Sequence, residues 1–419
     1  MHPLLRREIA GVPIAELARD FGTPTYVYDA RQIEQRIADL AAFDVIRFAQ
    51  KANSNLAVLD LCRRRGVLVD AVSAGEIHRA LLAGYGTQGD PPPIVYTADV
   101  FDRESLELVL EYGIAVNCGS PDMIDQYGER ISGGGGEIAL RVNPGFGHGH
   151  SRKTNTGGEA SKHGIWWEDV GESRERAERR GLRVTTLHMH IGSGVDLEHL
   201  ALVAGAMERC ASEVGAGIRT LSTGGGLPVP VRPGDPRIDV GRYFAIWDQA
   251  RKRLEDRFGH ALRLEIEPGR YLVAESGFLV TEIRAIKRMG GNTFYLVDAG
   301  FNTLARPVLY GAYHPMSIAP ADATPRAEHD VVVGGPLCES GDIFTQEEGG
   351  VVRSERLPEA HVGEHLVIER AGAYGFVMSS NYNGKPQPAE VLVRDGKAHL
   401  VRARQTLADL VRGESIPEG

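Results

Sequence analysis

Short apolar runs alternate with longer amphipathic segments over the first two thirds of the chain. Eight runs rich in β-branched residues predict strands at residues 45–50, 67–72, 94–98, 114–118, 138–143, 184–191, 218–223 and 262–267. Between them, apolar residues recur at helical spacing, for example over 55–65, 74–84, 103–113 and 196–215. Strands that alternate with helices predict a parallel sheet. Eight such units over about 245 residues match the usual size of an α/β (β/α)8 (TIM) barrel.

A doubly wound open sheet is the competing interpretation. It has little support, because no GxGxxG motif follows the first predicted strand. After about residue 272 the pattern changes, since strand-like runs dominate and a helix is expected only in the tail. These runs are 278–289, 293–300, 329–335, 364–371 and 389–404, the last containing the hairpin signal Asp395-Gly396. We therefore expect a barrel domain over 27–271 and a mostly antiparallel β domain built from 1–26 and 272–419.

Charge and cysteine content narrow the class of protein. The chain has 47 Lys+Arg against 56 Asp+Glu, a formal charge of −9, which disfavours nucleic acid or an anionic membrane as partner. No stretch approaches the ~20 apolar residues of a membrane span. The first residues show no signal peptide, and the four cysteines form no CxxC pair. Together these features favour a cytoplasmic protein.

Side chains that can take part in catalysis or ligand binding follow the predicted strands. Barrel enzymes carry their catalytic groups where the strands end, so these positions should share one rim. They are Lys51, Ser73 with Glu76 one turn into the next helix, Arg141, the segment His188–Ser193, the triplet Gly224–Gly226 and the segment Glu267–Arg270.

This combination suits pyridoxal 5′-phosphate (PLP). A glycine-rich turn at a strand–helix junction exposes backbone N–H groups to a phosphate, to which Ser193 could add a donor. A lysine can hold the cofactor as a Schiff base. Glu267 is placed to face the pyridine nitrogen, and His190 could stack on the ring.

Each feature alone also has a simpler explanation. A lysine after a strand is usually a solvated charge, and a glycine triplet is usually a tight loop. His188 and His190 face the same way and fit core hydrogen bonding or stacking better than metal binding, because no third ligand is spaced nearby. The segment 147–150 fits a polar loop better than a metal site, so no metal is expected. Cys338 alone fits a buried small side chain.

Nine short motifs together resemble the fold-type III PLP-dependent decarboxylases, whose architecture is that of alanine racemase and ornithine decarboxylase. They are FAQKANSN around Lys51, VDAVSAGE, HMHIGSGV, TGGGL, EIEPGRYLV, VDAGFN, GPLCESGD, GAYGF and NYNGKP. Residues 143–165 and 306–314 look like the bacterial diaminopimelate decarboxylase branch of that family. The resemblance covers nearly the whole chain. It implies PLP-dependent conversion of meso-2,6-diaminopimelate to L-lysine and CO2, the last step of lysine biosynthesis.

The resemblance also implies a role for each matching residue. Lys51 would carry the cofactor and Cys338 would donate the proton that replaces CO2. The cofactor would be bound by Lys51, Ser73, His190, Ser193, Gly225, Gly226, Glu267, Gly269, Arg270 and Tyr374. The substrate would be held by Arg270, Arg306, Tyr310, Glu339 and Tyr374. In this family Cys338 and Glu339 would reach the site of the other subunit, so a homodimer with shared active sites is implied.

Three alternatives stay open at this point. Another decarboxylase of the same fold type would act on ornithine, arginine or carboxynorspermidine. An alanine racemase would place an arginine at the pyridine nitrogen, where Glu267 aligns here. A non-enzymatic PLP carrier or an inhibitor-binding relative would be expected to lack Lys51 or Cys338, and both are present.

Overall fold

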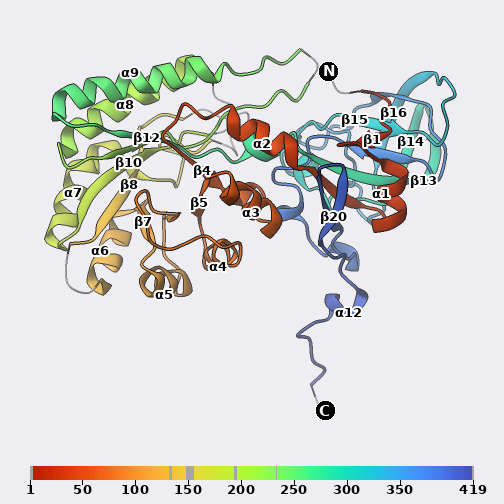
Figure 1. Ribbon diagram of the computed structural model, residues 1–419. Coiled ribbons are helices and arrows are strands. Elements are labelled where there is room, and N and C mark those ends of the chain that lie inside the picture. Colours follow the sequence, from red (N-terminus) through yellow and green to blue (C-terminus); the bar gives the residue numbers. More distant parts are fainter. Residues whose placement is uncertain (1–2, 132–134, 148–154, 193–195, 233, 418–419) are drawn as a thin grey trace. The chain divides into compact units, whose positions relative to one another are not determined.

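The chain folds into two compact units (Figure 1). The computed structural model describes residues 3–131, 135–147, 155–192, 196–232 and 234–417. The barrel unit comprises Glu34–Val229 and Arg237–Leu272, and the sheet unit comprises Met1–Ile33, Pro230–Pro236 and Val273–Gly419. The short segment 230–236 joins the sheet unit through Arg370, which donates to the carbonyl of Pro230.

The barrel unit confirms the predicted closed barrel of eight parallel strands. The strands are β4 (Val45–Ala49), β5 (Leu68–Ala71), β6 (Ile94–Ala98), β7 (Ala115–Cys118), β8 (Glu137–Asn143), β10 (Arg183–Met189), β11 (Thr220–Ser222) and β12 (Arg263–Ile266). Each pairs in parallel with the next, and β12 returns to β4, which closes the ring. A short strand that the pattern does not predict, β9 (Ile165–Trp166), adds to β8.

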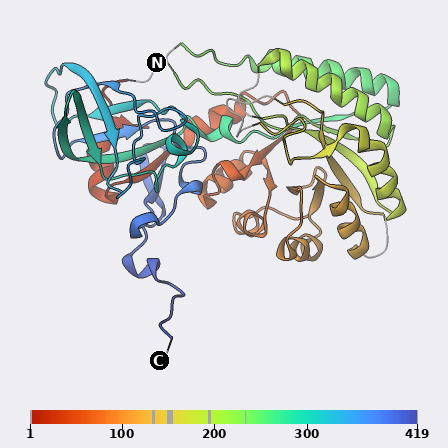
Figure 2. The same cartoon turned by 180° about the vertical axis from the view of Figure 1, so that it is seen from behind.

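Helices cover the outside of this ring, and Figure 2 shows the long pair α8 and α9 side by side in green. They are α3 (Leu56–Arg64), α4 (Ala74–Leu82), α5 (Arg103–Tyr112), α6 (Pro121–Arg130), α7 (Val170–Arg179), α8 (Leu197–Val214), α9 (Val240–Phe258) and the single turn α10 (Arg270–Val273). Six of them begin at a side chain that accepts a backbone N–H of the first turn, which satisfies a donor the helix leaves open. These caps are Asn55, Ser73, Asp102, Ser120, Asp196 and Asp239.

The interior of the barrel is unusually polar. Arg47 on β4 is 1% exposed and binds both oxygens of Glu265 on β12, at 2.9 Å each. Its Nη1 also donates to the carbonyl of Pro92 at 2.9 Å. A TIM barrel normally fills this space with apolar side chains. Here a cavity of about 1140 Å³ runs along the interior, and Arg47, Glu265 and Glu267 line it.

The Arg47–Glu265 pair gives a stability prediction. Arg47→Met should leave a buried carboxylate without its partner and lower the free energy of unfolding by about 3–5 kcal/mol. The double variant Arg47→Met/Glu265→Met removes both charges and should recover most of that loss. Urea unfolding followed by circular dichroism measures both, and an unchanged midpoint in the single variant would contradict the assignment.

The sheet unit is mostly antiparallel, as the sequence predicts. Its main sheet runs β17 (Glu355–Pro358), β16 (Glu328–Gly334), β14 (Asn292–Val297), β13 (Gly277–Met289), β3 (Thr25–Asp29), β19 (Ala389–Arg394) and β20 (Lys397–Arg402). Strand β18 (His365–Ile368) pairs with β13 and with β15 (Met316–Ala319). Two pairings are parallel, β14 with β16 and β3 with β19. Asp395 and Gly396 both have positive φ in the β19–β20 turn, which matches the predicted hairpin.

The first residues of the chain belong to this sheet. Strand β3 pairs with β13 and β19, and the sheet unit continues to Ile33 within α2 (Ala30–Ala38). The domain change expected at residue 27 therefore falls inside β3. The remaining elements of the unit are β1 (Glu8–Ile9), β2 (Val12–Pro13), α1 (Ile14–Phe21), α11 (Arg306–Tyr310) and the predicted tail helix α12 (Leu407–Leu410).

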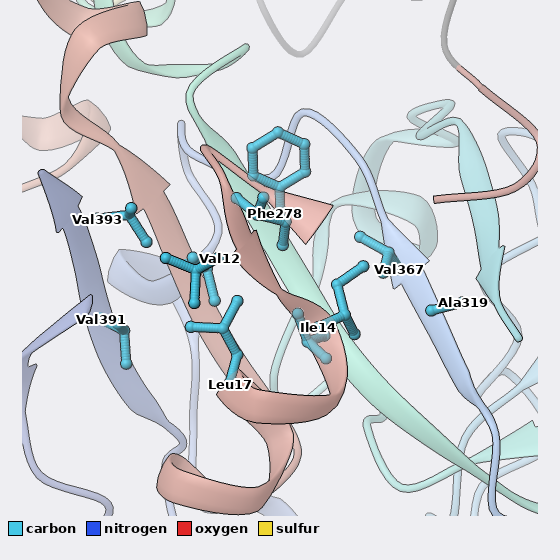
Figure 3. Packing of buried hydrophobic residues seen from close by; sticks show 11 residues of the cluster. Val12, Ile14, Leu17, Phe278, Ala319, Val367, Val391 and Val393 are labelled. Atoms are coloured by element: carbon cyan, nitrogen blue, oxygen red, sulfur yellow. The ribbon is translucent and has the colours of Figure 1, made fainter. Parts of the chain in front are cut away.

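One face of the sheet carries an apolar core, shown in Figure 3. Ile14 and Leu17 of α1 point onto the sheet, where Val391 and Val393 of β19 and Val367 of β18 meet them. All five side chains are at most 1% exposed. Burial of this size contributes about 1.5–3 kcal/mol per large side chain and fixes α1 on the sheet.

Candidate active site

Lys51 lies in a single 3₁₀ turn directly after β4 and its side chain is exposed. Gln50 fixes this turn, because its fully buried side-chain amide donates to the carbonyls of Asp70 (3.2 Å) and Glu76 (3.1 Å). Lys51 lines a cavity of about 630 Å³ together with Arg141 and Lys162. The rigid turn therefore presents the amine to an open space at the strand ends.

Glu267 follows β12 and is 8% exposed. Its Oε1 accepts the hydroxyl of Ser222 at 3.0 Å, and its Oε2 lies 3.0 Å from Nε2 of His188. Burial alone would raise the pKa of this carboxyl, but His188, Arg47 and Ser222 outweigh it and lower the pKa to about 2. The site thus holds a buried carboxylate that is ionised at neutral pH.

His190 stands beside the glycine triplet. A Cβ on Gly226 would lie 3.4 Å from Cε1 of the His190 ring, and one on Gly225 would lie 2.4 Å from the carbonyl oxygen of Glu267. The turn therefore requires glycine, and at Gly224 and Gly226 the positive φ adds to this requirement. Burial, with the charges of Lys51 and Arg141, holds the pKa of His190 well below its usual value, so the ring is neutral.

The other residues expected around the cofactor occupy the same strand ends. Gly269 packs against the turn of Lys51, since a Cβ there would lie 3.3 Å from the carbonyl oxygen of Ala49. Arg270 is the first residue of α10. Ser73 uses its hydroxyl to accept the N–H of Glu76 at 3.2 Å, so it is the cap of α4. Ser193 lies outside the described residues.

Two acids lie near Lys51: Glu76, which the sequence places at the strand ends, and Asp70, which sequence reasoning missed. Asp70 on β5 is 3% exposed, and burial together with the charge of Glu267 raises its pKa to about 6. Burial also raises the pKa of Glu76 to about 7. Clustered acids with displaced pKa values are typical of functional sites. Both residues lie in the motif VDAVSAGE, and that motif was the sequence signal that could have drawn attention to Asp70.

In the sheet unit, Arg306, Tyr310 and Tyr374 come together. Arg306 begins α11 and is 8% exposed, and its guanidinium lies 5.9 Å from the ring centre of Tyr310 and 5.7 Å from that of Tyr374. Tyr374 has φ of 56°, a left-handed conformation that is costly outside glycine and is found where a side chain must be aimed. His314 Nε2 lies 3.4 Å from Nε of Arg306.

Cys338 and Glu339 are both exposed on a loop of the same unit. The loop is shaped by Asp342, which is 4% exposed and accepts the N–H groups of Leu337 (2.8 Å) and Phe301 (2.7 Å). The N–H of Cys338 donates to Asn383 at 2.7 Å. Asp342 and Asn383 are supporting residues that sequence reasoning missed, although both fall in quoted motifs.

Thiols and metal-binding groups add two observations. Cys62, Cys118 and Cys210 are buried, and no disulfide joins any of the four cysteines. Within the described ranges, no three His, Cys, Asp or Glu side chains are placed to share a metal ion. Of the segment Gly147–His150, only Gly147 is described.

Among the residues that the structure describes, no helix is both long and apolar enough to cross a membrane.

Comparison with known proteins identifies the family. Residues 30–274 match the family described as pyridoxal-dependent decarboxylase, pyridoxal binding domain. The chain is 53% identical over 417 residues to the diaminopimelate decarboxylase of Streptomyces coelicolor, covering 99% of this chain and 94% of that protein. The chain belongs to the diaminopimelate decarboxylases.

Other members of this family agree in sequence and fold. The diaminopimelate decarboxylase of Escherichia coli is 52% identical over 407 residues, which are 96% of each chain. A crystal structure of a diaminopimelate decarboxylase covers 98% of both chains at 50% identity with a TM-score of 0.93. The Helicobacter pylori diaminopimelate decarboxylase complexed with L-lysine, 31% identical, covers 95% of this chain and 98% of its own with a TM-score of 0.85.

The residues present at the barrel rim fit the pyridoxal cofactor of this family. An exposed amine at Lys51 can form the Schiff base, and the buried, ionised Glu267 suits a protonated ring nitrogen. The buried His190 has a pKa held well below its usual value, and a neutral, planar ring of this kind can stack on the cofactor. The glycine turn leaves no room for a side chain where a phosphate would approach.

Proposed function

We propose that this protein catalyses the PLP-dependent decarboxylation of meso-2,6-diaminopimelate to L-lysine and CO2, the last step of lysine biosynthesis. The observation that carries the proposal is the identity of 52–53% to diaminopimelate decarboxylases over nearly the full length of the chain. The intact set Lys51, Glu267 and Cys338 supports an active enzyme rather than a cofactor carrier.

The barrel residues bind and polarise the cofactor. Lys51 would hold the cofactor through its exposed amine. The bound cofactor would supply an electron sink for the decarboxylation at Cα. Glu267 would keep a negative charge near the ring nitrogen, His190 would stack on the ring, and Gly225 and Gly226 would offer N–H groups to the phosphate.

Other cofactor contacts come from the neighbouring turns. We assign them to Ser73, Ser193, Gly269, Arg270 and, from the sheet unit, Tyr374. The neutral His190 supports stacking, because a charged ring beside Lys51 and Arg141 would be unfavourable.

Substrate recognition requires partners for a second amino acid head group. Arg306, Tyr310 and Arg270 would bind the distal carboxylate, Glu339 the distal amine, and Tyr374 would lie beside both substrate and cofactor. The geometry that supports this is the Arg306–Tyr310–Tyr374 cluster, since a buried guanidinium suits bidentate binding of a carboxylate. Ornithine and lysine lack the distal carboxylate, so they would not make this contact and should bind more weakly.

We further propose that the enzyme is a cytoplasmic homodimer with shared sites. The exposed position of Cys338 and Glu339 supports sharing, because both side chains are accessible to a second copy. The cysteines without disulfides support a reducing compartment.

Cys338 gives the prediction that tests this sharing. Cys338→Ala should bind PLP normally but lose about 100-fold in the rate of lysine formation, the usual size of a lost general acid. Cys338→Ala mixed with Lys51→Ala should regain activity, because one site of a mixed dimer would hold both native groups. Heterodimers that form without regaining activity would contradict shared sites.

The decisive experiment for the proposed function is CO2 release from meso-diaminopimelate, measured with and without added PLP. We expect PLP-dependent release with stoichiometric L-lysine. Decarboxylation of ornithine at an equal or higher rate would instead identify another decarboxylase of this fold type.

A further inference from the structure

A second histidine, His188, contacts the acid expected to bind the ring nitrogen. His188 precedes the stacking residue His190 by two positions on β10, so it points the same way but one layer deeper in the barrel. Its Nε2 lies 3.0 Å from Oε2 of Glu267, while Ser222 occupies Oε1 at 3.0 Å. His188 is 2% and Ser222 1% exposed, so water from outside the barrel does not replace either contact.

The other charged groups around Glu267 either bind another residue or are themselves acids. The groups that face it are Arg47 on β4, Asp70 on β5, and His188 and His190 on β10. Arg47 binds both oxygens of Glu265, and Asp70 is itself an acid. His188 is therefore the neighbour whose ring nitrogen lies against Oε2 of Glu267.

Both ring nitrogens of His188 are buried, and neither makes an aligned hydrogen bond among the described residues. The 3.0 Å separation of Nε2 from Oε2 of Glu267 is therefore a close polar contact. His188 also lines the 1140 Å³ cavity, whose lining includes the polar side chains of Asn117 and Thr186. A polar cavity of this size holds water, which can hydrogen-bond to Nδ1 while Nε2 faces Glu267.

We infer that His188 is a positioning residue that holds Glu267 as an oriented carboxylate against the cofactor's ring nitrogen, through the contact at Nε2. The inference rests on the proposed function, since it presumes that Glu267 binds PLP. It explains how a buried acid stays ionised, because an isolated buried carboxylate would be expensive. Ser222 and His188 together fix both carboxylate oxygens, leaving the remaining lone pairs for the ring nitrogen.

A matched pair of substitutions tests the role of Nε2. In His188→Gln the side-chain amide reaches as far as Nε2, whereas in His188→Asn it ends near the position of Nδ1. Both remain polar and fit the cavity, so both should fold. Thr186→Val is the control, because it changes the same strand and the same cavity without touching Glu267.

The main readout is loss of PLP from each holoenzyme during dialysis, followed by absorbance. We expect His188→Asn to release PLP about 10- to 100-fold faster than the wild type, as for a lost hydrogen bond to a charged group. His188→Gln should stay within about threefold, and Thr186→Val should match the wild type. The pH at which the visible absorbance of the holoenzyme changes should move about one unit lower in His188→Asn, because the ring nitrogen loses support for its proton.

Two results would overturn the inference. One is equal PLP release by His188→Asn and the wild type, and the other is an equal loss in the Asn and Gln variants, which would assign the effect to the ring and not to Nε2. Failure of the proposed function would look different, since the wild-type protein would then carry no PLP absorbance at all.

Discussion

Lys51→Ala is expected to lower lysine formation by at least about 10⁴-fold, as removal of a covalent catalytic group does in other enzymes. The amine stands in a turn fixed by the buried Gln50, which donates to the carbonyls of Asp70 and Glu76. The variant should also lose the absorbance of covalently bound PLP, because the Schiff base requires this amine. Steady-state rates and a visible spectrum measure the two effects.

Lys162→Ala is the matched control for this prediction. Lys162 lines the same cavity as Lys51 and carries the same charge. Its removal should leave the covalent spectrum unchanged. If Lys51→Ala kept the absorbance of covalently bound PLP and Lys162→Ala lost it, the assignment of Lys51 as the cofactor lysine would be wrong.

Glu267→Gln should reduce kcat by about 10²- to 10³-fold, the usual effect of removing one preorganised electrostatic contact. The amide carries no charge to keep a proton on the ring nitrogen, so the cofactor would accept electrons less readily. A pKa of about 2 means that Glu267 is ionised at all ordinary assay pH values. The loss should therefore be nearly constant across neutral and mildly acidic pH.

Glu137→Gln makes the same chemical change at the opposite end of the barrel cavity, where Glu137 pairs with the exposed Arg183 and Arg219. Exposed pairs contribute little, so this variant should keep its kcat. Equal kcat values for the Glu267 variant and the wild type would remove Glu267 from the cofactor site.

The barrel could be predicted because its strands carry their own signal. Runs such as 94–98 and 138–143 are mostly buried on both faces, so apolar and β-branched residues dominate them without a polar alternation. Strand β9 has only two residues and no such signal. Strand β3 was divided by the boundary expected at residue 27, because its partners β13 and β19 lie hundreds of residues away.

Part of the site could also be predicted, because the predicted strands give the positions of the strand ends. Once the strand ends are known, Lys51, His190 and Glu267 fall on one rim. The contacts His188–Glu267 and Arg47–Glu265 did not follow, because they depend on which side chains of separate strands meet inside the closed ring. Motif matching drew attention to Cys338 and not to Asp342, whose carboxylate shapes the loop.

The position of β3 has a consequence for synthesis on the ribosome. The hydroxyl of Tyr28 on β3 donates to Glu390 on β19, a partner 362 residues later in the chain. All barrel strands have been translated once Leu272 is made, whereas both neighbours of β3, the strands β13 and β19, come later in the chain. The barrel can therefore close before β3 has a complete sheet around it. The sheet unit is completed only by the last strands to be translated. A prematurely terminated product that ends before Ala389 would therefore carry a finished barrel and an unprotected strand edge, the kind of species that chaperones and proteases remove.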